Sequence, residues 1–381
     1  MIYRTSCFLF VLSLLTACST HSHWEEIKTA RKTFEAQRLE PSPLPGYHDF
    51  RGAIHVHSYI SHDSKGTPDE ILQAAKIARL NFLIMTDHNN PRIYQEGMNG
   101  RYGNLLVIRG AEIGMNHSYI LAIGLPRDLD PPPHTMEEAL RQVKALGGMA
   151  IVAHPKRFRS WDSQEYQAME IYNLLDSIQE QRWRYPRYLF DFLYSFDSHP
   201  EELFLSVIER PDWGLNKWDE INRDRKITAI GTSDAHQNVK FLGRRLDPYS
   251  ISLRFVDTHI LASRLDQEKV LSALRSGHAY VSHDLLADPT GFQFFAADRT
   301  HTWIMGDDVP LGPGLQLNVK SPLSARIRLF KNGEIIRETV SDVLALPVPT
   351  DGMGIYRAEL SLKVLGKWWP WIFSNPIYIK G

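Results

Sequence analysis

The chain has 381 residues and a formal net charge of −1, from 43 basic and 44 acidic residues. Its hydrophobic fraction of 43% and charged fraction of 23% are those of a soluble globular protein, large enough for one large domain or a large domain with a smaller one. A near-neutral chain has no global field to draw it to nucleic acid or acidic lipid, which argues against a dedicated nucleic-acid binder, although a local basic channel stays compatible with these values.

Residues 1–17 are predicted to be a lipoprotein signal peptide. Arg4 is the only charge before an apolar run over 8–15, which is too short to span a bilayer. The run ends in Leu15-Thr16-Ala17-Cys18, which matches the bacterial lipobox, where the cysteine thiol accepts a diacylglyceryl group. Lipidation of Cys18 would anchor the chain in a membrane; an ordinary cleaved secretory signal is the alternative.

The compartment follows from the two cysteines and the residue after the lipobox. Cys7 and Cys18 both belong to the export segment, so the mature body would have no thiol, which suits an oxidising compartment. Ser19, rather than Asp, favours the outer membrane. We therefore expect a cell-envelope protein that faces the periplasm, with a polar tether over 18–49 that contains one possible short helix.

The body from Arg51 onward alternates short apolar runs with amphipathic helical stretches, the pattern of repeated β-α units. Capping boxes at Thr67–Glu70 and Thr135–Glu138 predict two helix starts. The pattern predicts an α/β protein with a β/α barrel over 50–283. The predicted strands are 53–57, 82–86, 105–108, 119–123, 149–153, 168–172 and 227–231.

Three further features complete the domain plan. An aromatic-rich helical insertion over about 177–226 could wall or cap the site, and a helix over about 266–276 should end at Gly277. After Asp284 the segments alternate, and Asn332-Gly333 is a strong hairpin signal. These features predict a small C-terminal β-sandwich over 284–381.

Histidine and carboxylate side chains recur at the ends of the predicted strands. A single buried histidine is more often a core residue than a ligand, but so many at one edge have no comparable core explanation, because buried charges need partners or metals. An H-x-H pair at a strand end would place both imidazoles on one face. The candidates are His55, His57, Asp63, His88, Glu112, His117, His154, Asp234 and His236.

This set, in its order and strand context, resembles the metal motifs of the polymerase and histidinol phosphatase (PHP) superfamily over residues 50–283. The C-terminal segment is similar to its CehA/McbA-type branch. The resemblance implies a distorted (β/α)7 barrel with two or three divalent metal ions. It implies that His55, His57, Glu112 and Asp234 hold the first metal, that Glu112 bridges to a second held by His117 and His154, and that Asp63, His88 and His236 hold a third.

Other residues near these motifs have less certain roles. Asp87 could orient a ligand or cap a strand end, and His62 could be a proton donor, a substitute ligand or an exposed loop residue. Lys156 and Arg157 could bind substrate phosphate or be solvated charges. Glu170 and Asn173 could line the site or be structural.

Clustered cations among nitrogen and oxygen ligands favour hydrolysis by an activated hydroxide, and Zn, Mn and Fe are all compatible with the ligand types. The leading hypothesis is a phosphoesterase acting on a small phosphomonoester or a nucleotide. A 5'-3' exonuclease on DNA or RNA ends is possible but not favoured. Two further hypotheses are a carbamate, ester or amide hydrolase and a non-catalytic binding lipoprotein.

Overall fold

The computed structural model describes residues 22–381. The predicted signal peptide and the lipidation site Cys18 lie outside the described residues. Within the described part, no helix has both the length and the apolar character needed to span a membrane.

All seven predicted strands are present, and they pair with one another in chain order. β1 pairs with β2 and β2 with β4 in parallel, β4–β5 and β5–β6 are antiparallel, and β6–β7 and β7–β8 are parallel again. The two antiparallel pairs depart from a simple repeat of β-α units, because a two-residue turn and not a helix joins β4 to β5. The bounds are β1 His48–Val56, β2 Phe82–Met85, β4 Leu105–Met115, β5 Ser118–Ile123, β6 Met149–Ala153, β7 Ala168–Asn173 and β8 Thr228–Thr232.

Hydrogen bonds do not demonstrate a closed barrel. In the described residues no ladder joins β8 to β1; instead one bridge links Val56 to Ala235, and the Ala235 N–H donates to the carbonyl of His55 at 3.2 Å. A buried apolar cluster nevertheless draws side chains from every one of the seven strands, including Ile54, Ile108 and Ile230. The distorted barrel stays a prediction on this α/β framework.

The helices on this framework begin mostly where capping residues predict. Thr67 starts α2 (Pro68–Ile77) with a complete capping box. Thr135 also accepts from the Glu138 N–H at the start of α4 (Met136–Ala145), but the Glu138 carboxylate accepts from the His134 N–H, so the second box is incomplete. The remaining short elements of this part are α3 Arg92–Glu96, β3 Gly100–Tyr102, β9 Lys240–Phe241, β10 Arg244–Arg245, α9 Tyr249–Phe255, β11 Asp257–Ala262 and β12 Ala279–Ser282.

The predicted helical insertion and the helix near 266–276 are both present. α10 (Gln267–Ser276) ends at Gly277, whose φ of 77° is the left-handed conformation that glycine adopts without strain. The insertion consists of α5 Leu174–Glu180, η1 Arg182–Arg184, α6 Tyr185–Ser195, α7 Pro200–Leu205 and α8 Asp212–Asn222.

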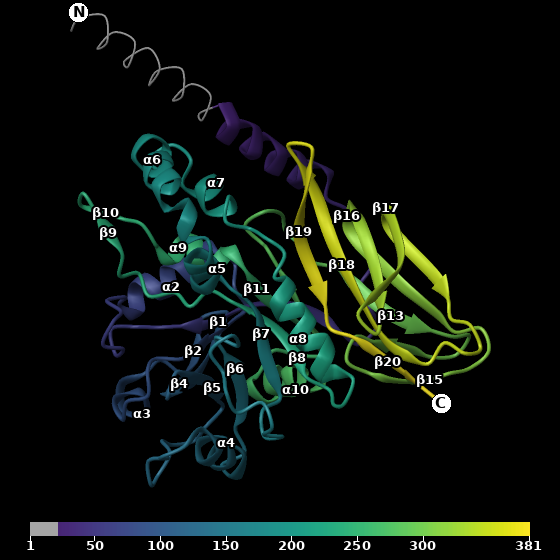
Figure 1. The fold of residues 1–381 in the computed structure, drawn as a ribbon, viewed down its shortest axis with the longest axis horizontal. Coiled ribbons are helices and arrows are strands. Elements are labelled where there is room, and N and C mark those ends of the chain that lie inside the picture. Colours follow the sequence, from purple (N-terminus) through teal and green to yellow (C-terminus); the bar gives the residue numbers. More distant parts are fainter. Residues whose placement is uncertain (1–21) are drawn as a thin grey trace, which may run out of the picture.

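The C-terminal region is rich in strands and continues from the α/β part, beside which it lies in Figure 1. β12 pairs with β19 in an antiparallel ladder, and the Asn375 side chain bonds the backbone of Ala229 and Ala279. The predicted turn at Asn332-Gly333 joins β16 to β17. The strands are β13 Gln293–Ala297, β14 Thr302–Ile304, β15 Asp308–Pro310, β16 Gln316–Lys331, β17 Glu334–Pro347, β18 Gly354–Val364, β19 Lys367–Ser374 and β20 Ile377–Lys380.

Residues 22–37, which lie in the stretch predicted to be a tether, form a helix packed against the body. Trp24 and Ile27 are buried in the main apolar core. Arg31 forms ion pairs with Glu201 at 2.5 Å and Glu202 at 2.7 Å, which fixes the helix to α7. This part of the stretch is therefore docked and not a free linker.

Candidate metal centre

The ends of β1, β2, β6 and β8 and the middle of β4 bring the predicted ligands together. His55 lies in β1 at a break in its pairing with β2 and has a φ of 66°. His154 and Asp234, which follow β6 and β8, also have positive φ values of 46° and 50°. Such conformations are uncommon for residues other than glycine, and they occur in turns and at functional sites. His55 and His57 both direct Nε2 to the same carboxylates, as the H-x-H spacing predicted, although the pairing of β1 with β2 is irregular at His55.

Four side chains form the centre of the site. The Nε2 atoms of His55 and His57 lie 3.3 and 3.4 Å from Asp234 Oδ1, and each lies 3.5 Å from Glu112 Oε2. Ligands about 2.0–2.2 Å from one tetrahedral ion would be separated from each other by about 3.3–3.6 Å. These spacings thus match the edges of a coordination shell.

The same two carboxylates extend to His154. Its Nε2 lies 3.4 Å from Glu112 Oε1 and 3.5 Å from Asp234 Oδ2, the oxygens that do not face His55 and His57. Each carboxylate therefore offers one oxygen to each side. This arrangement fits the bridging role that the family resemblance implies for Glu112. Asp234 is placed so that it could bridge in the same way.

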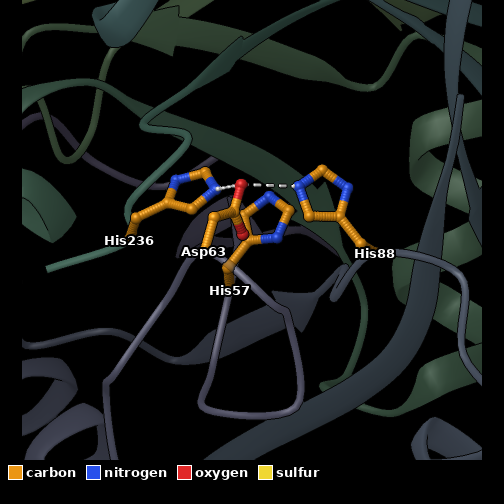
Figure 2. A group of neighbouring side chains, drawn as sticks. All are labelled: His57, Asp63, His88 and His236. Atoms are coloured by element: carbon orange, nitrogen blue, oxygen red, sulfur yellow. Dashed lines mark hydrogen bonds and ion pairs between the residues drawn. The ribbon is translucent and has the colours of Figure 1, made fainter. Parts of the chain in front are cut away.

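A third group lies beside the first and is drawn in Figure 2. Asp63 Oδ2 is 3.0 Å from His88 Nε2 and 3.4 Å from His236 Nε2. His57 belongs to this group as well, because its ring stacks on His236 with centroids 4.0 Å apart. His88 Nδ1 lies 3.2 Å from Glu112 Oε2, so the His88 imidazole connects this group to the centre.

The three central imidazoles are each held at Nδ1, which directs Nε2 into the site. The Nδ1 atom of His55 lies 2.6 Å from Glu170 and that of His154 lies 2.9 Å from Asp176. Ser61 Oγ donates to Asp87 and can therefore accept from His57 Nδ1–H, 3.0 Å away. Such partners fix the tautomer and orientation of metal-binding histidines.

These contacts define the positions of Asp87 and Glu170. Asp87 is buried and accepts from the Ser58 N–H and from both the Ser58 and Ser61 hydroxyls, so it positions the loop that orients His57. Glu170 accepts from Thr232 and from the His154 N–H in addition to its contact with His55. Asp87 holds other groups in place. Glu170 does so too, and it also forms a further group with His154 and Asp176, whose possible ligand atoms lie within 4.8 Å of one another.

The electrostatics of the site reflect its buried carboxylates. Burial lowers the pKa of His55, but the charges of Asp234, Glu170 and Glu112 outweigh burial, and the pKa lies well above its usual value. In the same way burial opposes charging of His154, while Asp176 and Glu112 raise its pKa to about 11. Burial alone would raise the pKa of Asp234, but His55 and His57 outweigh burial, and the pKa lies well below its ordinary value. The pocket therefore favours positive charge strongly.

The donor set fits divalent metal ions. The buried atoms His55 Nε2, His57 Nε2, Glu112 Oε1 and Asp234 Oδ1 have no hydrogen-bond partner among the described residues. The first two face Asp234 Oδ1, and Glu112 Oε1 faces His154 Nε2. Unpartnered buried polar atoms are costly unless a ligand satisfies them. Imidazole nitrogens and carboxylate oxygens suit Zn, Mn and Fe alike.

His117 is the one predicted ligand that the structure does not bring into these groups. It is exposed, and it forms the β4–β5 turn with Asn116; both residues have positive φ, as a two-residue hairpin turn of type I′ requires. The sequence signal was available, because an Asn at the first turn position between two apolar runs is typical of such hairpins.

The remaining predicted residues lie around the groups or apart from them. His62 is exposed, with Nε2 3.9 Å from Asp63 and its ring beside that of His88. Arg157 lines the cavity beside the groups and donates to Gln179. Lys156 forms an ion pair with Glu180 at 2.6 Å and lines a different pocket.

Sequence reasoning missed two groups that orient histidines, Asp176 and Ser61, and one wall residue, Tyr119. Asp176 lies in the first turn of α5, where an acidic residue is ordinary helix chemistry and gives no signal of a site. Ser61 is one of many serines in the sequence, and only its contacts distinguish it. The Tyr119 ring lies against His154, with centroids 5.3 Å apart.

A cavity of about 450 Å³ opens beside the groups. Asp63, His88, Glu112, His154 and Asp234 form one side of it. Its volume lies in the range of small-molecule sites, about 300–1,000 Å³. The arrangement can therefore present one small substrate to the whole ligand set.

No family model matches the sequence. A curated relative, the uncharacterised protein MJ1587 of Methanocaldococcus jannaschii, is 33% identical over 95 residues, which are 24% of this chain and 54% of that protein. The chain thus matches about half the length of this relative.

Three solved structures are similar. A two-domain protein from Bacteroides vulgatus, containing a predicted PHP-like metal-dependent phosphoesterase, has 14% identity and a TM-score of 0.45, with 88% of this chain and 98% of that one covered. A metal-dependent phosphoesterase, so named by prediction, from Bifidobacterium adolescentis has 15% identity and a TM-score of 0.31, with 51% and 92% covered. Endonuclease Q in complex with a 27-mer duplex containing an abasic lesion has 13% identity and a TM-score of 0.37, with 60% and 56% covered. Likeness at this level assigns no activity, so the geometry of the site carries the functional argument.

Proposed function

We propose that this chain is a metal-dependent hydrolase of the PHP type that cleaves small phosphoesters. One observation carries the proposal: eight of the nine predicted ligands converge into adjoining groups, within each of which the possible ligand atoms lie within 4.8 Å of one another. The convergence supports the distorted barrel as well, because the ends of separate strands supply these residues. The eight ligands are His55, His57, Asp63, His88, Glu112, His154, Asp234 and His236.

Two or three divalent ions held by these residues would supply an acidified water as nucleophile and positive charge for the oxygens that gain charge. The chain's own groups do the rest. Glu170, Asp176 and the Asp87–Ser61 pair hold the imidazoles in place, so the ligand geometry is fixed before substrate arrives. Arg157, at the cavity wall, would bind a phosphoryl oxygen.

We further propose an envelope location, with Cys18 lipidated and the body in the periplasm at the outer membrane. The lipobox and the absence of cysteine after Cys18 support this location. Exonuclease activity has less support, because Arg157 is the sole arginine or lysine among the residues that line the cavity in the described chain.

The test is elemental analysis of the purified full-length protein together with a substrate panel. The panel contains phosphomonoesters, phosphodiesters, aryl carbamates and single-stranded oligonucleotides. His57→Ala and Asp234→Asn should lose at least one bound metal and reduce phosphoester turnover by about a thousandfold or more, since each removes a ligand. His301→Ala, an exposed histidine in the C-terminal region, is the control and should retain both. Normal metal content in the first two variants, or turnover of carbamates alone, would refute the proposal.

A further inference from the structure

Several of the residues that line the cavity beside the metal centre are apolar. Leu174, Leu175 and Ile178 come from α5, and Phe204 comes from α7. Val239 and Leu246 add two more side chains at the two ends of the β9–β10 hairpin. These six side chains lie among the lining residues together with the ligand set, so one substrate could contact both.

Charge restricts what the rest of the substrate can be. The lining residues include the carboxylates of Asp63, Glu112, Asp234 and Asp247. Arg157 is engaged with Gln179 at 2.9 Å and lies 3.8 Å from Asp176. Metal ions would offset the carboxylates for one phosphoryl group, but a second anionic group would meet apolar surface without a cation to pair with.

We infer that the substrate is a phosphomonoester whose leaving group is apolar, an aryl or a compact alkyl group. The phosphoryl group would face the ligand set and Arg157, and the leaving group would contact the α5 and α7 side chains. This inference rests on the proposed function and adds the substrate class to it. Burial of an apolar leaving group gives favourable binding free energy in proportion to the area removed from water.

The test compares naphthyl, phenyl, glyceryl and nucleoside monophosphates. We expect kcat/KM for naphthyl phosphate to exceed that for glyceryl phosphate by about tenfold or more. Ile178→Asn should bring the ratio of the two kcat/KM values most of the way toward one, and its metal content should equal that of the native protein. Ile77→Asn, the same change at an exposed position on α2, is the matched control.

Binding of inert phosphonates separates this inference from the proposed function. Calorimetry on the metal-loaded protein should show naphthyl phosphonate binding about tenfold tighter than methyl phosphonate, a difference that Ile178→Asn reduces. Equal affinities would overturn the inference even if phosphoesters are hydrolysed. A clear preference without hydrolysis would support the apolar site and refute the phosphoesterase.

A second inference comes from a different surface, the outer side of α6. Tyr185, Leu189 and Leu193 follow one another at i, i+4 and i+8 and are 42–45% exposed. Trp183 and Tyr194 beside them are 73% and 58% exposed. Amphipathic helices normally bury such a stripe, so this one is without the partner that its pattern requires in the described chain.

The β9–β10 hairpin extends this surface. Phe241 contacts Phe192 of α6 with ring centroids 6.2 Å apart, and Arg244 forms an ion pair with Asp197 at 2.7 Å. Leu242 at the hairpin tip is 76% exposed. We name the combination of the α6 stripe, its two flanking aromatic residues and Leu242 the α6 face.

Two observations favour a lipid surface as the occupant of the α6 face. Arg182 and Lys240 border it, and neither has an ion pair among the described residues, so both are available to anionic headgroups. The described chain also begins near α6, because the charges of Arg187 and Asp191, on the side of α6 away from the stripe, act on His23. Cys18, the predicted lipidation site, is only four residues before Ser22.

We propose that the α6 face rests on an anionic bilayer, with its aromatic and aliphatic side chains in the headgroup region. The base of the β9–β10 hairpin lines the metal cavity through Val239 and Leu246, so the docked protein would hold its cavity close to the lipid surface. Trp and Tyr beside Arg and Lys are the residues that favour this interface.

The test uses the full chain in nanodiscs of phosphatidylcholine with and without phosphatidylglycerol. A nitroxide attached at Leu242→Cys should be accessible to oxygen and protected from a water-soluble nickel complex, more so with the anionic lipid. The same label at Val340→Cys, on exposed β17, is the control and should stay in water. Protection of both labels, or of neither, would overturn the proposal, and the second result would favour a protein partner for this face.

Discussion

At the scale of single residues, the candidate metal centre depends on groups that hold its histidines in place. Glu170 accepts from His55 Nδ1, from the His154 backbone and from Thr232, and it is fully buried. One carboxylate thus fixes two of the proposed ligands. A carboxylate also strengthens its imidazole partner as a ligand, which a neutral group does less well.

We therefore expect Glu170→Gln to weaken metal affinity by about 10–100-fold while the protein stays folded. Competition with a chelator of known affinity measures the change. Glu180→Gln, the same substitution at a surface residue paired with Lys156, is the control and should have no effect on affinity. Unchanged affinity in Glu170→Gln would show that this carboxylate is only structural.

For His117, in contrast to Glu170, we expect substitution to leave metal binding unchanged. Because it lies exposed in the type I′ turn between β4 and β5, His117→Ala should retain the metal content of the native protein and turn over phosphoesters within about twofold of it. Elemental analysis and the phosphoester assay measure both. Loss of one metal equivalent would instead support the ligand role that the family resemblance implies.

Residue type and strand context were sufficient to predict eight of the grouped side chains. In β/α folds functional side chains gather where strands end, and strand ends can be located from the local sequence. They were not sufficient for His117 or for Asp176. The first needed recognition of turn chemistry. The second needed the tertiary position of α5, which no local pattern contains.

At the scale of elements, sequence periodicity predicted the strands well and their directions less well. Apolar runs gave the positions of all seven strands, yet β5 runs antiparallel to both neighbours because a tight turn precedes it. Glu112 lies close to the point where β4 exchanges β2 for β5 as its partner, between Arg109 and Gly110. Whether two neighbouring strands run parallel depends on whether the connection between them is long enough to return to the same end of the sheet, and the sequence indicates this only weakly.

α8 is attached to the C-terminal strands by a buried ion pair. Arg357 of β18 donates two hydrogen bonds of 2.7 Å to Asp219, and its side chain is only 3% exposed. Breaking such a pair leaves a buried charge partly uncompensated. Glu359 remains as a second partner and limits the loss.

We expect Asp219→Asn to lower the free energy of unfolding by about 2–4 kcal/mol, as measured by urea denaturation. Glu220→Gln, next to it on α8, removes only a surface pair with Lys217 and should change stability by less than about 1 kcal/mol. Similar small effects in both variants would mean that Asp219 is not needed to keep α8 on the strands.

At the scale of the whole molecule, the α/β part and the C-terminal strands form one continuous structure. The sequence predicted the change in texture after Asp284 but not the β12–β19 ladder or the bonds of Asn375, because contacts between distant segments are not encoded in local patterns. The helix over 22–37 is docked for the same kind of reason, through Trp24 and Ile27.

A buried charged cluster lies at the start of this connection. His259 of β11 is held between Asp49 of β1, at 2.8 Å, and Asp284, at 3.0 Å. Burial alone would lower the pKa of His259, but the charges of Asp284 and Asp49 outweigh it and raise the pKa to about 10. In the unfolded chain the pKa returns to its ordinary value near 6.5.

A raised pKa in the folded state means that the folded protein binds the proton more tightly. The stabilisation from His259 is therefore fully present below about pH 6.5, decreases between pH 6.5 and 10, and is absent above that range.

We expect the free energy of unfolding of the native protein to fall as pH rises from 7 to 10. In His259→Gln it should be lower by about 2–5 kcal/mol at pH 7 and should vary less with pH across that window. Urea denaturation at several pH values measures both, with exposed His301→Gln as control. An equally steep decline in His259→Gln would assign the pH dependence to other groups and leave His259 without a role in joining the two parts.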